Sequence, residues 1–470
     1  MADQQGKEMI HLKYFNAFVK IEGADRLQAK MISDLLSFEP EGIEHARRHM
    51  PPYLRDKWDG RKRLLDRRSM TFPSGLAPMV VQFLRAENVP YKVFEMRVKP
   101  TSTSKLPIIA SLEPRSYQIE ILELAKKISR GIIVVGTGGG KTISAGLMIA
   151  NKGVDTLFVT PDTGLREQTL SVFRWLFGGD VVSSDVTSDE PIVVSNIQAL
   201  ASKEVKDLER FNMLIIDEFH HSASTQYQQL NHKTATAYYR YGLTGTPVRP
   251  DGNDMVMFGV LSSIIFKKTA SDLIDEGWLV PPEITMVTHR LRGWSKLNYR
   301  QAYDRIIIDK DFNDIVASIA NETIEANKQT IILVKRKDHG ALLASLIPDA
   351  VYISGDDSLT HRDKMKEEFN NKTIRALIAT SVMGEGQDIP NIDVLINARL
   401  QESEIQTKQG IGRALRLAQG SKTFEESVAL GKDKCAVYDF LITGQRHLKA
   451  HSESRMHQYR SERSFRVIVK

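Results

Sequence analysis

The string GTGGGKT at residues 136–142 constrains the fold of this chain more than any other feature. It follows the apolar run Ile132–Val135 and precedes residues 143–150, which we expect to form a helix. Its glycines allow the backbone N–H groups to face an anion, and the N-terminus of the next helix adds partial positive charge. A strand, a glycine-rich loop and a helix in this order predict a phosphate-binding site in an α/β fold.

The last two residues of the loop indicate the ligand. Lys141 stands at the spacing from which its ammonium reaches the β- and γ-phosphates of ATP. The Thr142 hydroxyl stands where it would hold Mg²⁺. The full pattern has a glycine where this chain has Val135. A purely structural turn is the alternative, and the Lys-Thr pair argues against it. The predicted nucleotide contacts of this loop are Gly136, Thr137, Gly138, Gly139, Gly140, Lys141 and Thr142.

A second string, DEFH at residues 217–220, follows the apolar residues 213–216. Its carboxylates are therefore expected at a strand end, where open α/β sheets bind ligands. We assign Asp217 to the Mg²⁺ shell and Glu218 to orienting or deprotonating the attacking water. A solvated pair of acids is the alternative, which the preceding phosphate loop makes less favoured. We expect His220 to couple this site to a second lobe.

A third string, QGIGRALR at residues 409–416, places Arg413 and Arg416 at i and i+3 on one face of an expected helix. An arginine that enters from a second lobe can stabilise the γ-phosphate oxygens and accelerate hydrolysis by about 10³ to 10⁵. Taken alone, such a helix more often solvates a surface or contacts nucleic-acid phosphates. Together with the first two strings, it predicts hydrolysis that depends on closure of two lobes.

As an ordered set, these strings resemble the motifs of superfamily 2 DExH helicases over about residues 112–445. The resemblance implies an ATP-dependent motor with two RecA-like lobes. EPRSYQ at residues 113–118 is similar to the adenine-reading motif, which implies that Arg115 and Gln118 bind the base. LTGTP at residues 243–247 implies that Thr244 and Thr246 couple hydrolysis to movement.

The same resemblance implies where a nucleic-acid track is held. ATSVMGEGQDIP at residues 379–390 resembles a motif that contacts both nucleic acid and nucleotide, and the last motif has Gly410 after its glutamine where an arginine is usual. The implied track contacts are Thr160, Pro161, Ser195, Gln198 and Thr380. The implied further nucleotide contacts are Gly386, Asp388 and Gln409.

The N-terminal string KWDGRKRLLD at residues 57–66 is similar to phage UvsW-type DNA branch-migration helicases. Basic residues outnumber acidic ones around it, which suits contact with phosphates, and Trp58 could stack on a base. The expected contacts are Trp58, Arg61, Lys62 and Arg63. The alternative is a charged surface hairpin whose Trp58 belongs to the core.

The remaining pattern predicts domains. Two series of apolar runs alternate with helical segments, as doubly wound parallel sheets require, and KPTSTSKLP at residues 99–107 has linker composition. We predict an α/β fold of two tandem RecA-like parallel-sheet lobes after a small α/β N-terminal domain. The predicted boundaries are 1–104 for the basic N-terminal domain, 105–282 and 283–445 for the lobes, and 446–470 for a basic tail. The tail is either a helix returning to the first lobe or a nucleic-acid contact.

Composition agrees with a nucleic-acid motor. The chain has 470 residues, a net charge of +6 and a pI near 9.0, which favours a polyanionic partner. Its single cysteine, Cys435, forms no intramolecular disulfide and leaves no cysteine cluster for zinc. No run of about 18 apolar residues and no signal sequence is found, so we expect a cytoplasmic protein, in a bacterium or a phage-infected cell, without membrane contact.

The prediction is an ATP-dependent DNA helicase or translocase, with ATP and Mg²⁺ as cofactors, acting on forked or branched DNA in recombination, repair or replication. Single-stranded DNA is a possible track. An RNA helicase fits the motor strings equally well, and a motor subunit of a restriction-type assembly is a third possibility. A regulatory P-loop module is disfavoured because strings from both lobes are present.

Overall fold

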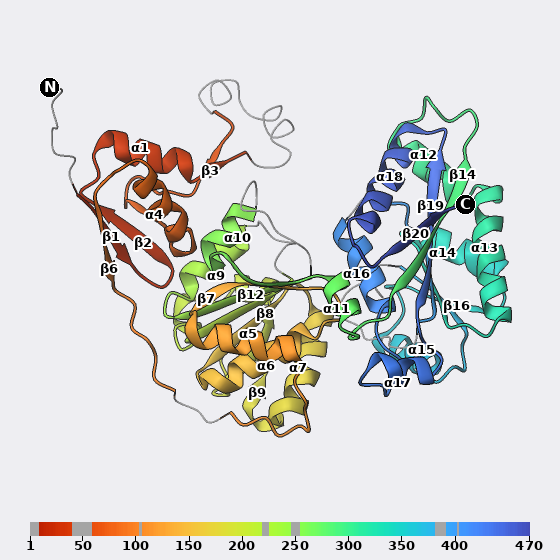
Figure 1. Cartoon of the computed structure of the whole chain (residues 1–470), viewed down its shortest axis with the longest axis horizontal. Coiled ribbons are helices and arrows are strands. Elements are labelled where there is room, and N and C mark those ends of the chain that lie inside the picture. Colours follow the sequence, from red (N-terminus) through yellow and green to blue (C-terminus); the bar gives the residue numbers. More distant parts are fainter. Residues whose placement is uncertain are drawn as a thin grey trace. The chain divides into compact units, whose positions relative to one another are not determined.

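A computed structural model describes residues 9–39, 59–102, 106–218, 225–245, 254–380, 392–401 and 404–470. The chain divides into two compact units, each described below by itself (Figure 1). The first unit holds residues 1–134 and 141–267, and the second holds residues 135–140 and 268–470. No helix in the described ranges is long and apolar enough to cross a membrane.

The first unit begins with a small mixed sheet in the order β5-β2-β1-β6. β1 pairs antiparallel with β2 and parallel with β6, and β2 pairs antiparallel with β5. The elements are β1 Ile10–Tyr14, β2 Phe18–Glu22, α1 Arg26–Leu35, β3 Ser37–Phe38, β4 Lys62–Arg63, β5 Thr71–Pro73, α4 Ala77–Ala86 and β6 Tyr91–Glu95. This is the small α/β domain expected before the lobes.

A seven-stranded sheet follows in the order β13-β7-β12-β11-β8-β10-β9, and its pairs from β7 to β9 are parallel. Every residue of β7, β8, β10, β11 and β12 is buried, as expected for strands covered on both faces. The strands are β7 Arg130–Val135, β8 Thr156–Thr160, β9 Val182–Ser183, β10 Ile192–Asn196, β11 Met213–Asp217, β12 Tyr239–Thr244 and β13 Ile264–Lys268. The helices include α5 Ser116–Lys127, α6 Lys141–Lys152, α7 Thr163–Phe177, α8 Ile197–Ala201, α9 Thr225–Lys233 and α10 Asp254–Leu261.

The second unit holds another parallel seven-stranded sheet, ordered β16-β17-β15-β18-β19-β14-β20. Its strands are β14 Pro282–Arg290, β15 Thr330–Leu333, β16 Ala350–Ile353, β17 Ala376–Ala379, β18 Val394–Asn397, β19 Cys435–Thr443 and β20 Arg466–Val469. Its helices are α11 Ala270–Asp275, α12 Tyr299–Ile306, α13 Lys310–Glu325, α14 Lys337–Leu346, α15 Leu359–Asn370, α16 Glu404–Ala414, α17 Phe424–Ala429 and α18 Arg446–Arg460. The two predicted parallel sheets are thus confirmed.

The basic segment 446–470 is part of this second sheet, whereas the sequence suggested a separate tail. It forms α18 and the edge strand β20, which pairs with β14 (Figure 1). A buried ion pair holds α18: the Arg455 guanidinium lies 2.7 Å from Asp439 of β19, and the Tyr459 hydroxyl donates to the same carboxylate at 2.5 Å. The Arg455 and Asp439 side chains are 1% and 0% exposed. Removing either partner would therefore leave the other as an unpaired buried charge.

Buried arginines also join the N-terminal domain to the first seven-stranded sheet. Arg130, the first residue of β7, donates to the Ser74 hydroxyl and to the Asn16 carbonyl, both at 2.6 Å. Arg240 donates to the Asn231 side chain at 2.8 Å, and Asn231 in turn donates to the Ala17 carbonyl at 3.0 Å. The first unit is therefore held together by hydrogen bonds that cross from the small domain into the sheet.

Gly75 provides a test of this packing. A Cβ at this position would lie 2.1 Å from the Phe258 carbonyl oxygen of α10, which is backbone and cannot rotate away. We expect Gly75→Ala to destabilise the first unit by about 1–3 kcal/mol, measured as an earlier first transition in urea unfolding. Gly179→Ala is the matched control, because nothing lies within 4 Å of that Cβ. Equal stability of the two variants would contradict the close packing of the small domain on α10.

Candidate nucleotide site and nucleic-acid contacts

The expected strand, glycine loop and helix are present. β7 ends at Val135 and α6 begins at Lys141, with the loop between them. Gly138 and Gly140 have φ angles of 86° and 71°, a left-handed conformation that other residues adopt at a cost. The two glycines thus let the loop turn back toward the N-terminus of α6, where backbone N–H groups favour an anion.

An ion pair joins this loop to the second string. The Lys141 ammonium lies 3.0 Å from the Glu218 carboxylate, and both side chains are only 10% exposed. Glu218 has a φ of 44°, and its N–H donates to the Leu243 carbonyl at 2.9 Å and to the Asp217 side chain at 3.0 Å. A non-glycine residue held in the left-handed region by its neighbours is typical of functional sites.

Asp217 ends β11 and is 4% exposed. Burial, and next the neighbouring Glu218 carboxylate, raise the pKa of Asp217 to about 7. Two acids at the end of a parallel strand, with one lysine beside them, make a site where additional positive charge favours the ionised form of Asp217.

Thr244 ends the neighbouring strand β12, where it pairs in register with Val134 of β7. Its side chain is fully buried, next to the strand that leads into the loop. The other predicted coupling residues, His220 and Thr246, lie outside the described residues, as do Trp58, Gly386 and Asp388. The Gln409 backbone belongs to α16, and its side chain is not among those that the structure describes.

The predicted base-reading residues lie together at the N-terminus of α5. The Arg115 backbone N–H donates to the Gln118 side chain at 2.9 Å, and the Arg115 guanidinium donates to the Tyr117 hydroxyl at 3.1 Å. Gln118 is 3% exposed and Tyr117 is fully buried. The side-chain oxygen of Gln118 therefore caps its own helix in this structure.

The predicted arginine pair lies at the end of α16 in the second unit. α16 ends at Ala414, so Arg413 is in its last turn and Arg416 follows the helix, whereas the sequence suggested one helical face for both. The Arg416 N–H still donates to the Arg413 carbonyl at 3.4 Å. Within this unit the loop lies against α16, since a Cβ on Gly412 would come 2.4 Å from the Thr137 Cβ.

The predicted track contacts divide into buried and accessible residues. Thr160 and Ser195 are almost fully buried, and the Thr160 hydroxyl donates to the Asp162 carbonyl at 2.9 Å. Thr380 is 4% exposed. Pro161 is partly exposed and Gln198 is exposed. The last two are therefore the predicted first-lobe contacts that a ligand can reach.

Within the basic N-terminal string, Lys62 and Arg63 form β4, which pairs antiparallel with β3. The Arg61 guanidinium donates to the Ser37 hydroxyl and carbonyl at 2.8 Å each, and Arg63 lies 2.5 Å from Asp59 and 3.4 Å from Asp34. These two arginines therefore stabilise the small domain itself. Lys62 lines a cavity of about 280 Å³ between this domain and α9 and α10.

Asp162 was not singled out from the sequence. It caps α7 and lies next to Pro161, at the carboxyl end of β8. Its position as a polar residue directly before a helix is the signal that could have identified it. Asn196, which lies between the predicted contacts Ser195 and Gln198, caps α8 and donates to the Thr163 hydroxyl at 3.0 Å.

Three known families match parts of the chain. Residues 9–95 match "DNA helicase UvsW, N-terminal", residues 111–249 match "Type III restriction enzyme, res subunit", and residues 312–418 match "Helicase conserved C-terminal domain". The second and third matches fall on the two seven-stranded sheets, and the phosphate loop and acidic pair lie within the second. The chain is a superfamily 2 helicase.

Individual relatives agree with this membership. The helicase is 25% identical over 434 residues to the "ATP-dependent DNA helicase uvsW" of Enterobacteria phage T4, covering 83% of this chain and 84% of that protein. It is 26% identical to the "DNA 3'-5' translocase XPB2" of Sulfurisphaera tokodaii, over 68% of this chain and 83% of that protein. The solved structure of S. cerevisiae Dbp5 with RNA and ADP BeF3 matches with a TM-score of 0.53 and 14% identity, over 76% of this chain and 90% of Dbp5. That likeness shows the RecA-like fold of the two lobes.

Lys141 provides the most direct test of the site. Its ammonium lies beside Glu218 at the start of α6. We expect Lys141→Ala to abolish ATP turnover, because the cation that would reach the phosphates is lost. Steady-state phosphate release would measure the loss, and an unchanged far-UV circular dichroism spectrum would show that the fold persists. Normal turnover in a folded variant would exclude this loop as the nucleotide site.

Proposed function

We propose that this helicase couples ATP hydrolysis to movement on DNA, and that it unwinds or branch-migrates forks and junctions. The observation that carries the proposal is the match of residues 9–95 to the UvsW N-terminal family in the same chain as both motor families. The phage T4 relative, which matches over 83% of this chain, is named as a DNA helicase, and the Sulfurisphaera tokodaii relative is named as a DNA translocase. Both names support DNA as the track.

The nucleotide roles follow from the geometry of the first sheet. We assign Lys141 to the β- and γ-phosphates, Thr142 and Asp217 to Mg²⁺, and Glu218 to the attacking water. These residues fit a magnesium ion carried with ATP, because Mg²⁺ prefers oxygen ligands. The positive charge of the ion would also lower the raised pKa of Asp217 and so favour its ionised form. Bound Mg²⁺ would supply charge neutralisation at the phosphates. Until nucleotide binds, the ion pair with Lys141 compensates Glu218.

Arg413 and Arg416 complete the proposed mechanism from the second unit. We assign them to the γ-phosphate oxygens, where arginines stabilise the developing charge. Hydrolysis would then require the two lobes to close, and reopening would move the protein one step along its track. Track contacts would be made mainly to phosphates, so binding should weaken steeply with salt.

The stimulation of ATP turnover by nucleic acids tests the proposed track. We expect forked or four-way junction DNA to stimulate phosphate release more than single-stranded DNA, duplex DNA or RNA, all at one stated salt concentration. The physical reason is that the N-terminal domain and the motor would engage the junction together, which adds phosphate contacts. Stronger stimulation by RNA would favour an RNA helicase. Stimulation by duplex alone, without unwinding, would favour a restriction-type translocating motor, the class named by the family match at residues 111–249.

The proposed role of Glu218 is tested by Glu218→Gln. The amide keeps the shape of the side chain but accepts no proton and forms no ion pair with Lys141. We expect ATP binding to persist and hydrolysis to fall by about 10² to 10⁴, the usual contribution of a general base. Fluorescent-ATP titration and single-turnover hydrolysis would separate the two steps. Hydrolysis at the wild-type rate would mean that another group activates the water.

A further inference from the structure

The short helix α11 packs directly on the phosphate loop. It follows β13, and the Gly136 N–H donates to the carbonyl of Lys268, the last residue of that strand, at 3.0 Å. A Cβ on Gly136 would lie 3.0 Å from the Ala270 nitrogen and 3.3 Å from Leu273. The first glycine of the loop therefore touches α11 at backbone distance, and no flexible side chain separates them.

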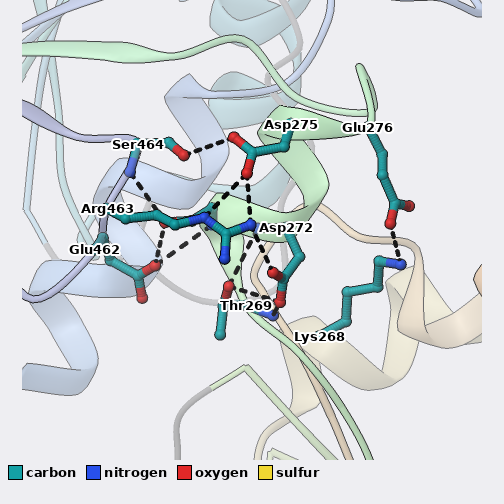
Figure 2. A network of polar contacts seen from close by, with 9 residues as sticks. Lys268, Thr269, Asp272, Asp275, Glu276, Glu462, Arg463 and Ser464 are labelled. Atoms are coloured by element: carbon teal, nitrogen blue, oxygen red, sulfur yellow. Dashed lines mark hydrogen bonds and ion pairs between the residues drawn. The ribbon is translucent and has the colours of Figure 1, made fainter.

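Arg463 binds α11 through two carboxylates of that helix (Figure 2). Its guanidinium lies 3.0 Å from the Asp272 carboxylate and 2.5 Å from the Asp275 carboxylate. These acids stand at i and i+3, on one face of the helix. Asp272 also accepts from the Thr269 N–H at 2.7 Å, which caps the N-terminus of α11. One arginine thus bridges the capped first turn and the last residue of the helix.

The residues on either side of Arg463 add contacts to the same helix. The Glu462 carboxylate accepts from the Ser271 hydroxyl at 2.8 Å, and Ser271 is 2% exposed. The Ser464 hydroxyl donates to the Asp275 carboxylate at 2.8 Å, and its N–H donates to the Ser271 hydroxyl at 3.3 Å. Figure 2 shows these side chains converging on α11 from one short segment.

That segment is itself anchored at both ends. Before it, α18 is held by the buried pair of Arg455 and Asp439, and after it β20 pairs with β14. An exposed ion pair contributes little by itself, and Arg463 is 65% exposed. Here, however, several hydrogen bonds act on one helix from a segment whose ends are both fixed.

We propose that residues 462–464, which we call the C-terminal clasp, position α11 and through it the phosphate loop for ATP. The three residues are positioning residues, since they contact α11 and not the nucleotide. The proposal rests on the assignment of residues 136–142 as the nucleotide loop. It gives the C-terminal segment a role in ATP use that neither the motor motifs nor the matched families, which end at residue 418, describe.

The test compares ATP kinetics of the full-length protein and its variants at saturating DNA. We expect Arg463→Ala to raise the KM for ATP by about two- to thirtyfold, the size of coupling that residues in a packed network can exert. Asp275→Asn should have a similar effect, and the double variant should lose less than the sum of the two single variants, because both substitutions break the Arg463–Asp275 pair. Arg463→Lys should recover part of the loss.

Arg466→Ala is the matched control. Arg466 is the first residue of β20, two residues after the clasp, and is also exposed, but its partner is Glu283 of β14, 3.2 Å away. Its KM for ATP should remain that of the wild type. Ser464→Ala removes one hydroxyl only and provides a second, milder variant if Arg463→Ala does not fold; it should raise KM with an unchanged thermal unfolding midpoint.

The outcomes separate the clasp from the nucleotide site. A wild-type KM in Arg463→Ala, together with inactive Lys141→Ala, would overturn the clasp and leave the nucleotide site in place. Active Lys141→Ala would overturn the nucleotide assignment itself. Additive losses in the Arg463 and Asp275 double variant, or an equal rise of KM in Arg466→Ala, would mean that the segment acts only through general stability.

Discussion

The parallel register of β7, β12 and β11 is the constraint on which the candidate site depends. Thr244 pairs beside Val134, and Asp217 pairs beside Leu243, so the carboxyl ends of the three strands meet at one edge. The phosphate loop leaves the first strand, and the acidic pair leaves the third. A slip of one residue in any pairing would turn these side chains to the other face of the sheet. The ion pair between Lys141 and Glu218 is possible only because the register holds.

Most of this arrangement could be predicted from the sequence. The apolar runs that precede the loop and the acidic pair become β7 and β11, and the second series of runs becomes β15 to β18. Such runs indicate strands buried on both faces, which are nearly continuous in apolar residues. The glycine spacing predicted the phosphate loop, because few other functions require that spacing. The fold class and the place of the candidate nucleotide site follow from these local patterns alone.

What the sequence did not reveal depends on long-range pairing. Thr160 and Ser195 occupy motif positions, but each lies within a strand whose neighbours cover it, so both side chains are buried. The segment 446–470 looks like a charged tail in the sequence, because Arg455 is then interpreted as a surface charge. Only the structure shows that Arg455 pairs with Asp439, 16 residues earlier on β19. Arg130 and Arg240 are likewise buried, although nothing in their sequence surroundings indicates it. Composition cannot distinguish a solvated arginine from one whose donors are satisfied by backbone carbonyls.

Contacts on two sides of the phosphate loop limit how it can move. On one side the loop continues a strand whose register is set by β12, and on the other it touches α11 through Gly136, where a Cβ has no room. Movement of α11 therefore acts on backbone and cannot be absorbed by rotation of a side chain. Because α11 is also bonded to the segment between α18 and β20, its position depends on the second sheet. A C-terminal strand at the edge of that sheet thus has a physical route to the candidate nucleotide loop.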